Sequence, residues 1–202
     1  MKRFIVASAS PRRKELLENV GFSFEIIPSD ADESCEDKLS PDELVKELAK
    51  RKAESVFENN TDAVVLGCDT VVEYGGTVLG KPESREDAKR MIKMLSGKKH
   101  NVHTGVCIID NEKTVSFVKT VKVEFYELSD ELIESYVATG ESDDKAGAYG
   151  IQGLGCVLVK GIEGDYFSVV GLPVAETVRA LSEFAIRGSQ FAIAGKISGE
   201  EK

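Results

Sequence analysis

The feature that most constrains the fold is an unbroken apolar run over residues 63–68, which a carboxylate, Asp69, follows directly. A strand that is apolar at every position is typical of a sheet that helices cover on both faces. A second apolar segment, over residues 4–7, has the same character but is shorter. We therefore expect a central strand at residues 63–68 and a buried strand at residues 4–7.

Signals for helix starts lie between and after these strands. Ser10-Pro11 and Ser40-Pro41 each place a capping residue before a proline at the first helical position, and Glu43 completes a capping box. Further strands are predicted at residues 24–28, 71–74, 77–79, 101–110, 114–126, 157–160 and 167–170, and further helices at residues 41–57, 84–95, 129–138 and 173–184.

The alternation of strands and helices favours an α/β fold with a mixed central sheet and flanking helices. The 202 residues fit one large domain or two small lobes around a cleft, and 42% hydrophobic residues suffice for a core. No change in composition marks a boundary between lobes. We expect one domain over residues 1–187 and a flexible tail over residues 188–202.

The charge balance and the cysteine pattern argue against several classes of protein. Lys and Arg total 26 against 35 Asp and Glu, and the net charge of −9 disfavours nonspecific nucleic-acid binding, which needs a basic face. No apolar run approaches the roughly 18 residues of a membrane-spanning helix, and the apolar stretch near the N-terminus is too short for a signal peptide. The four cysteines form no C-x-x-C pair. We expect a cytoplasmic protein with no nucleic-acid or membrane partner.

Three familiar motifs are present only in part. Gly75 to Lys81 matches most of a phosphate-binding P-loop, but Pro82 stands where a hydroxyl and an amide N–H are needed. The later glycine-rich segment does not form G-x-G-x-x-G. His100 and His103 lie on one predicted strand at positions that face opposite ways, so they do not form a simple metal pair.

The start of the first predicted helix gathers Ser8, Ser10, Arg12 and Arg13. A helix N-terminus offers free N–H groups and a partial positive charge, which suit an anion. Arginines there oppose the helix dipole, and a bound phosphate would offset that conflict. The alternative is a capped helix with two solvated arginines.

Asp69 stands at the end of the expected central strand, where open α/β sheets place their ligands. A partly desolvated carboxylate at such a position suits a general base. A carboxylate is also a good ligand for Mg²⁺. The alternative is a turn residue that accepts hydrogen bonds from local amides.

Other candidates are ambiguous when each is taken alone. Lys52 lies in an otherwise apolar helix pattern, and its simplest interpretation is a solvated residue. Lys81, between a glycine and a proline, sits on a stiff backbone that suits an anion contact. The acidic loop over residues 30–33 is ordinarily solvated, although one carboxylate from it could bind a metal. Gln152, in the glycine-rich segment 147–153, carries an amide able to pair with a base edge, or lies in an ordinary surface loop.

Taken together, these segments resemble the Maf family of nucleoside triphosphate pyrophosphatases, which is similar in fold to the inosine triphosphatase group. The matching segments span nearly the whole chain in the family's order. They are SASPRRKELL (8–17), ADE (31–33), KA (52–53), GCDTVV (67–72), GKP (80–82), SG (96–97), HTGV (103–106) and GAYGIQG (147–153).

The resemblance implies hydrolysis of a nucleoside triphosphate to the monophosphate and pyrophosphate, with a divalent cation, Mg²⁺ or Mn²⁺. It makes Asp69 the proton acceptor, and Asp69 and Glu33 the metal ligands. The polar and basic substrate pocket is Ser8, Arg12, Arg13, Glu33, Lys52 and Lys81. The residues linked to base choice are Arg12, Thr70 and Gln152.

The GAYGIQG segment resembles the branch that acts on dTTP and UTP, which implies removal of these or modified pyrimidine nucleotides from the pool. The family further implies a homodimer. Two alternatives stay open. One is a nucleotide-sensing regulator of septum formation in cell division, without significant turnover. The other is the branch that acts on 7-methyl-GTP.

Overall fold

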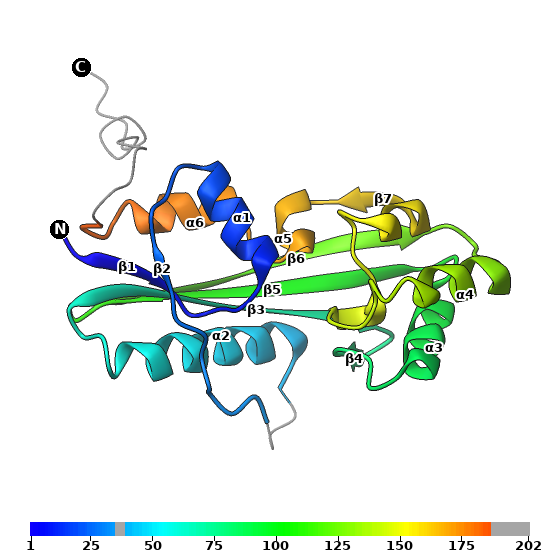
Figure 1. The fold of residues 1–202 in the computed structure, drawn as a ribbon, viewed down its shortest axis with the longest axis horizontal. Helices are drawn as coiled ribbons and strands as arrows, with labels where there is room; N and C mark the ends of the chain where they lie inside the picture. Colours follow the sequence, from blue (N-terminus) through cyan, green and yellow to red (C-terminus); the bar gives the residue numbers. More distant parts are fainter. Residues whose placement is uncertain (35–38, 187–202) are drawn as a thin grey trace. The chain divides into compact units, whose positions relative to one another are not determined.

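The computed structural model describes residues 1–34 and 39–186, so the tail expected over residues 188–202 lies outside the described residues. Within the described ranges, seven strands form one sheet in the order β2-β1-β3-β5-β6-β7, with β4 paired to β3 (Figure 1). The strands are β1 (Arg3–Val6), β2 (Glu25–Ile26), β3 (Ala63–Tyr74), β4 (Thr77–Leu79), β5 (Lys99–Ile109), β6 (Thr114–Phe125) and β7 (Val159–Glu163).

The pairing directions make the sheet mixed. β1 lies parallel to both β2 and β3, and its last pair joins Val6 to Leu66. β3 and β4 are antiparallel around Gly75 and Gly76, whose positive φ angles permit the tight turn, and β6 and β7 are antiparallel as well. The expected α/β class, with a mixed central sheet and flanking helices, is confirmed.

The predicted helix starts are largely confirmed. Ser40, Ser84 and Ser129 each accept a hydrogen bond from a backbone N–H in the first turn of the helix that follows. None of the helices in the described part of the chain is long and apolar enough to cross a membrane. The helices are α1 (Pro11–Asn19), α2 (Pro41–Phe57), α3 (Arg85–Leu95), α4 (Asp130–Ala138), α5 (Tyr166–Val170) and α6 (Val174–Leu181), with 3₁₀ turns η1 (Ala146–Ala148) and η2 (Leu154–Leu158).

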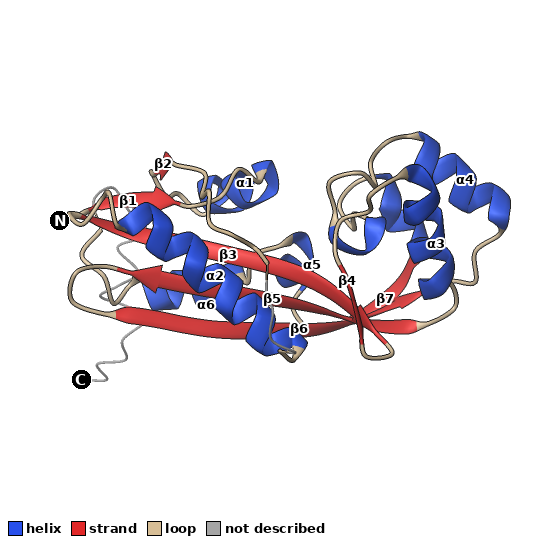
Figure 2. Cartoon of the chain, turned by 90° about the horizontal axis from the view of Figure 1, so that it is seen from below, coloured by secondary structure: helices blue, strands red, loops and turns tan. Residues whose placement is uncertain are grey.

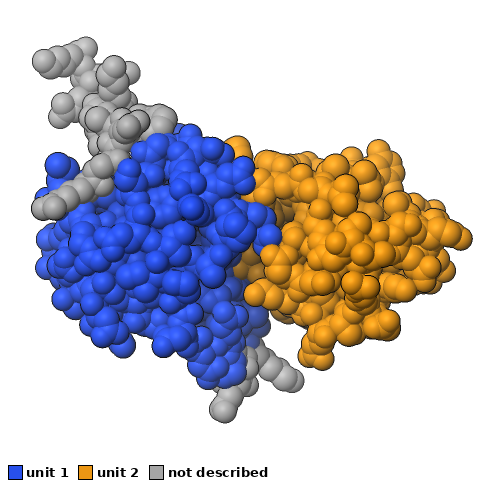
Figure 3. Space-filling view, viewed as in Figure 1, with its two compact units in different colours: residues 1–69, 105–118, 171–202 blue, residues 70–104, 119–170 orange. Residues whose placement is uncertain are grey.

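The chain divides into two compact units, coloured blue and orange in Figure 3. It passes from one to the other within β3, β5 and β6, and again after α5. Unit 1 comprises residues 1–69, 105–118 and 171–202, and unit 2 comprises residues 70–104 and 119–170.

In unit 1 the central strands are covered on both faces, by α2 on one and by α1 and α6 on the other (Figure 1). The α2 helix runs along β3 and β5 (Figure 2). Its backbone packs closely against two glycines of these strands. A Cβ atom at Gly67 would lie 2.2 Å from the carbonyl oxygen of Ala49, and one at Gly105 would lie 2.3 Å from that of Val45. These glycines therefore set how closely α2 can approach the sheet.

Gly67→Ala is expected to lower the free energy of unfolding by about 1–3 kcal/mol, the usual cost of overpacking a core. The new methyl group would meet backbone atoms of α2, which cannot swing aside as a flexible side chain does. Urea denaturation measures the loss. Gly161→Ala is the matched control, because among the described residues no heavy atom beyond its two chain neighbours lies within 4 Å of a Cβ there. Equal stability of the two variants would contradict the close packing.

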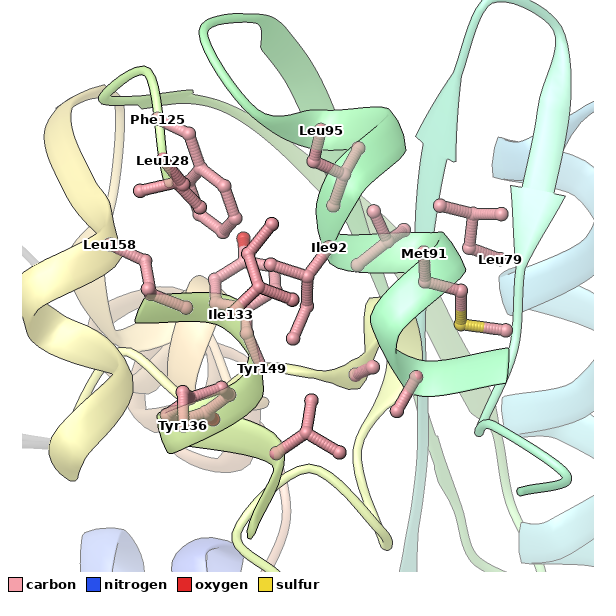
Figure 4. Close-up of a cluster of buried hydrophobic side chains, with 14 of the residues drawn as sticks. Leu79, Met91, Ile92, Leu95, Phe125, Leu128, Ile133, Tyr136, Tyr149 and Leu158 are labelled. Atoms are coloured by element: carbon pink, nitrogen blue, oxygen red, sulfur yellow. The ribbon is translucent and has the colours of Figure 1, made fainter. Parts of the chain in front are cut away.

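Unit 2 has its own hydrophobic core, drawn in Figure 4. Phe125, Tyr149 and His100 meet edge to face, with ring centroids 4.7–5.4 Å apart. His100 Nε2 lies 2.8 Å from the Tyr149 hydroxyl. His103 Nδ1 lies 3.1 Å from Thr120 Oγ1, so the two histidine rings have different partners.

Burial lowers the pKa of His100 to about 4, from an ordinary value of 6.5. The unfolded chain therefore takes up this proton near pH 6.5, whereas the folded protein does so only near pH 4. The contribution of His100 to the free energy of unfolding should be complete above pH 6.5. It should decrease as the pH falls from 6.5 to 4, with a loss of about 2 kcal/mol by pH 5. Urea denaturation at pH 7 and pH 5 tests this. His100→Gln should make the free energy of unfolding depend less on pH. An unchanged pH dependence in that variant would mean that another group takes up the proton.

At the end of unit 2, one predicted element is wrong and another begins later than predicted. Residues 167–170 form the helix α5 instead of a strand, because the Asp165 carboxylate accepts the N–H groups of Phe167 and Ser168 and starts a helical turn. The strand expected at 157–160 begins at Val159, since η2 occupies the residues before it.

Candidate active site

Asp69 is 8% exposed and lies within β3, which continues to Tyr74. The expectation that the strand ends at Asp69 is therefore wrong. It is β1 that ends nearby, since its last pair is Val6 with Leu66 and Ala7 donates its N–H to the Leu66 carbonyl at 2.8 Å. Asp69 consequently lies just past the carboxyl end of a parallel strand pair, where α/β sheets place ligands.

Lys52, on α2, brings a cation to Asp69. Its Nζ donates to Asp69 Oδ1 at 2.6 Å and lies 2.9 Å from Glu33 Oε1. Burial works to lower the pKa of Lys52, but the negative charge of Asp69 and hydrogen bonds to both carboxylates outweigh it, and the pKa is raised. Lys52 is thus a permanent cation between two carboxylates.

The interpretation of Lys52 as a solvated residue is wrong. Its side chain is only 14% exposed. Gly67 and Asp69 are two residues apart on β3, so they share the face on which α2 packs. The close approach at Gly67 brings Lys52 against Asp69.

Arg13, in the first turn of α1, is held by hydrogen bonds to Gly171 and Ser8. Its Nε donates to the Gly171 carbonyl at 2.9 Å, and its Nη1 donates to Ser8 Oγ at 3.0 Å. The Cys68 thiol donates to the same carbonyl at 3.2 Å. Burial raises the pKa of Cys68 despite the opposing charge of Arg13, so the thiol stays neutral. Arg13 is therefore anchored beside the residue that precedes Asp69.

The N-terminus of α1 differs from those of α2, α3 and α4. Ser10 holds the predicted N-cap position, but its side chain makes no capping hydrogen bond, and the first turn contains no acidic residue. The Ser10 N–H instead donates to Ser8 Oγ at 3.2 Å. Arg12 and Arg13 are half-buried in this turn. Ser10 therefore does not cap α1 as the second interpretation expects, and the anion site stays a prediction.

Thr70 belongs to unit 2, and a chain of hydrogen bonds fixes its hydroxyl. Thr104 Oγ1 donates to the Ser168 carbonyl at 2.9 Å. Since a hydroxyl has one proton, Thr70 is the donor in the 3.0 Å bond between the two threonine hydroxyls. The Thr70 hydroxyl is therefore held in one orientation.

Lys81 and Gln152, also in unit 2, are exposed. The turns that carry them are joined, because the Gly147 N–H donates to the Gly80 carbonyl at 3.0 Å. The interpretation of residues 147–153 as an ordinary surface loop is only partly correct, since Tyr149 is 6% exposed and packs in the core.

Unit 1 thus brings together most of the predicted site residues. Sequence reasoning did not identify Gly67, which lets α2 bring Lys52 to Asp69, or Gly171, whose carbonyl holds Arg13. Gly67 offers a signal in retrospect, as the single glycine inside an apolar strand, which often marks close backbone approach. The predicted site residues in unit 1 are Ser8, Arg12, Arg13, Glu33, Lys52 and Asp69, and those in unit 2 are Thr70, Lys81 and Gln152.

The donor set at Asp69 suits a divalent cation. Asp69 and Glu33 share the Lys52 ammonium, so their contacting oxygens are no farther apart than the two contact distances combined. Mg²⁺ typically takes one or two carboxylates together with phosphate oxygens and water. Across the described residues, no group of three or more His, Cys, Asp or Glu side chains is placed to hold a metal ion. The two carboxylates therefore fit a cation that also takes oxygens from its ligand.

Fold and site together define a mixed α/β protein in which Arg12 and Arg13 stand at a helix start and a lysine holds a buried carboxylate. Residues 3–184 match the family of Maf-like proteins, and the chain belongs to that family. It is 52% identical to proteins of Bacillus cereus (strain G9842) and Bacillus anthracis that are named dTTP/UTP pyrophosphatase, over 92% of this chain and 97% of each relative.

A solved structure of a HAM1 protein from Coxiella burnetii is similar in fold. It aligns with 91% of this chain and 100% of its own, with a TM-score of 0.50 and 14% identity. This likeness supports the expected inosine-triphosphatase-like fold class.

Proposed function

We propose that this protein is a nucleoside triphosphate pyrophosphatase that hydrolyses dTTP and UTP to the monophosphate and pyrophosphate. The observation that carries the proposal is the buried Lys52–Asp69 pair at 2.6 Å, which lies just past the carboxyl end of β1. The names of relatives 52% identical to this chain support the reaction and the substrates.

The charge distribution supports a triphosphate substrate. A triphosphate carries about four negative charges, which a protein of net charge −9 repels unless positive charge is concentrated locally. Arg12, Arg13 and Lys52 supply that charge in unit 1, and Lys81 adds a further cation in unit 2. Arginine guanidinium groups are well suited to phosphate because they donate two parallel hydrogen bonds.

Asp69 is the group best suited to act on the attacking water. Attack at the α-phosphorus builds negative charge on the phosphoryl oxygens and on the leaving pyrophosphate. Asp69 would orient the water and accept its proton, while Lys52 holds Asp69 in place through Oδ1. Arg13, fixed by Ser8 and Gly171, would stabilise the phosphate charge without having to reorganise.

Asp69 and Glu33 would hold Mg²⁺ or Mn²⁺. The cation would neutralise charge on the phosphate oxygens and stabilise the leaving group.

We also propose that modified pyrimidine nucleotides are substrates, and that the enzyme works in the cytoplasm as a homodimer. Light scattering on the purified protein tests the dimer.

A panel of nucleotides tests the proposal. The protein is incubated with Mg²⁺ or Mn²⁺ and dTTP, UTP, CTP or 7-methyl-GTP, and pyrophosphate release is measured. We expect release from dTTP and UTP that requires the cation. Tight binding of dTTP without release would favour the nucleotide sensor, and preference for 7-methyl-GTP would favour the other branch of the family.

Gln152→Ala is expected to reduce the preference for dTTP over CTP by about tenfold, the effect of losing a single hydrogen bond. The amide has one donor and one acceptor, which can match the edge of one base and not another. The ratio of kcat/KM for the two nucleotides measures the change. An unchanged ratio would remove Gln152 from base selection.

A further inference from the structure

Glu141, which follows α4 in unit 2, makes a set of contacts that the proposed reaction does not use. Its Oε2 accepts the Leu154 N–H at 2.7 Å, and its Oε1 accepts the Gly155 N–H at 3.0 Å. Oε1 also lies 3.1 Å from the Tyr136 hydroxyl, which donates to it. One carboxylate therefore holds the chain just after Gln152.

The chain before Gln152 is held by Tyr136, whose hydroxyl also donates to Glu141. The Gly150 N–H donates to the Tyr136 hydroxyl oxygen at 3.1 Å. Tyr136 is 3% exposed and its ring lies in the hydrophobic core of unit 2 (Figure 4). Glu141 and Tyr136 thus fix both ends of the segment 150–155, and Gln152 projects from it as an exposed residue.

Two glycines of this segment permit its close contacts, Gly153 with the Glu141 carboxylate and Gly155 with Gly150. A Cβ atom at Gly153 would lie 2.2 Å from Glu141 Oε2, and one at Gly155 would lie 2.4 Å from the Gly150 carbonyl oxygen. A side chain at Gly153 would displace the Glu141 carboxylate, and one at Gly155 would push against the Gly150 backbone. Gly153 and Gly155 therefore permit close packing of the backbone as well as turns of the chain.

The carboxylate is stable in its charged form. Partial burial works to raise the pKa of Glu141, but the N–H groups of Gly155 and Leu154 outweigh it, and the pKa is lowered. Hydrogen bonds from backbone N–H groups to a charged acceptor are stronger than those to a neutral one. The hydrogen bonds from residues 154 and 155 to Glu141 are therefore strong at neutral pH.

We propose that Glu141 is a positioning residue for base selection, which holds the segment 150–155 so that Gln152 meets the nucleotide base at a fixed angle. This rests on the proposed function, in which Gln152 takes part in base choice. A hydrogen bond discriminates between bases only when its donor and acceptor are held in place. Loosening the segment should therefore cost discrimination more than it costs affinity for the triphosphate.

A double-mutant cycle tests this on binding alone. The probes are the α,β-methylene analogues of dTTP and dCTP, which cannot be cleaved at the α–β bond, and calorimetry gives their dissociation constants. The proteins are the wild type, Glu141→Gln, Gln152→Ala and the double variant. Glu141→Gln places an NH₂ group against a backbone N–H, which removes at least one contact. Glu134→Gln is the control, since that carboxylate is exposed and pairs with Lys89.

We expect Glu141→Gln to reduce the dTTP-to-dCTP affinity ratio by about tenfold, and to have no further effect on the ratio in the Gln152→Ala background. Glu134→Gln should keep the wild-type ratio. An unchanged ratio in Glu141→Gln would overturn the inference. So would a loss that adds fully to that of Gln152→Ala, or equal binding of both analogues by the wild type.

Hydrogen exchange of the Leu154 and Gly155 amides separates positioning from general damage. These amides should exchange faster in Glu141→Gln while the amides of α3 and the melting temperature stay close to wild type. Unfolding of unit 2 as a whole would assign Glu141 a purely structural role. Because the binding ratio needs no turnover, a wild type that releases no pyrophosphate would refute the proposed function and leave this test intact.

Discussion

The Asp69→Asn protein is expected to fold normally and to release pyrophosphate from dTTP about a thousandfold more slowly than wild type, the scale of a lost general base. The amide has the size of the carboxylate and can still accept the Lys52 hydrogen bond, which measures 2.6 Å in the native protein. It cannot accept a proton from water, and it is a poor ligand for Mg²⁺. The measurement is kcat with saturating cation, together with a thermal melt.

Asp62→Asn is the matched control for Asp69→Asn. Asp62 is also a carboxylate of unit 1 and contacts Arg3 at 3.4 Å, but it is exposed. This variant should keep full activity. Turnover by Asp69→Asn at a rate near that of wild type would show that Asp69 is neither the base nor an essential metal ligand.

The Lys52→Met protein is expected to lose about a hundredfold in kcat/KM, the effect of removing a hydrogen bond to a charged group. Without the ammonium, Asp69 and Glu33 would face each other as like charges, and the site would lose a cation that attracts the triphosphate. Lower affinity and lower kcat should both contribute. Steady-state kinetics with dTTP over a range of Mg²⁺ concentrations separates the two.

Lys50→Met serves as the control on the same helix. Lys50 is exposed and contacts Glu54 at 3.7 Å, away from Asp69. Its loss removes the same charge from the protein and should change kcat/KM by less than twofold, because a solvated surface ion pair contributes little. Equal losses in the two lysine variants would mean that net charge, and not the contact with Asp69, governs activity.

The sequence predicted those parts of the fold that depend on local pattern. The apolar run before Asp69 identified the central strand, and Ser40-Pro41 with Glu43 identified the start of α2. Residues 167–170 were predicted wrongly because β-branched and aromatic residues favour strands. Hydrogen bonds from backbone N–H groups to the Asp165 carboxylate stabilise a helical turn there instead.

The site was predictable only as far as single residues carry their own chemistry. Arg13 beside a helix start and Asp69 after an apolar run are informative without a structure. Lys52 is not, because its burial depends on how closely α2 approaches Gly67, a contact between segments far apart in the sequence. The hold of Glu141 on residues 154 and 155 likewise exists only in three dimensions.

The fate of isotopically labelled water tests the central claim most directly. The wild-type protein is given dTTP and Mg²⁺ in H₂¹⁸O, and the products are analysed by mass spectrometry. Water activated by Asp69 attacks the α-phosphorus, so we predict dTMP that carries one ¹⁸O together with an equal amount of unlabelled pyrophosphate. Label in pyrophosphate, release of inorganic phosphate instead, or no cleavage at all would contradict the account.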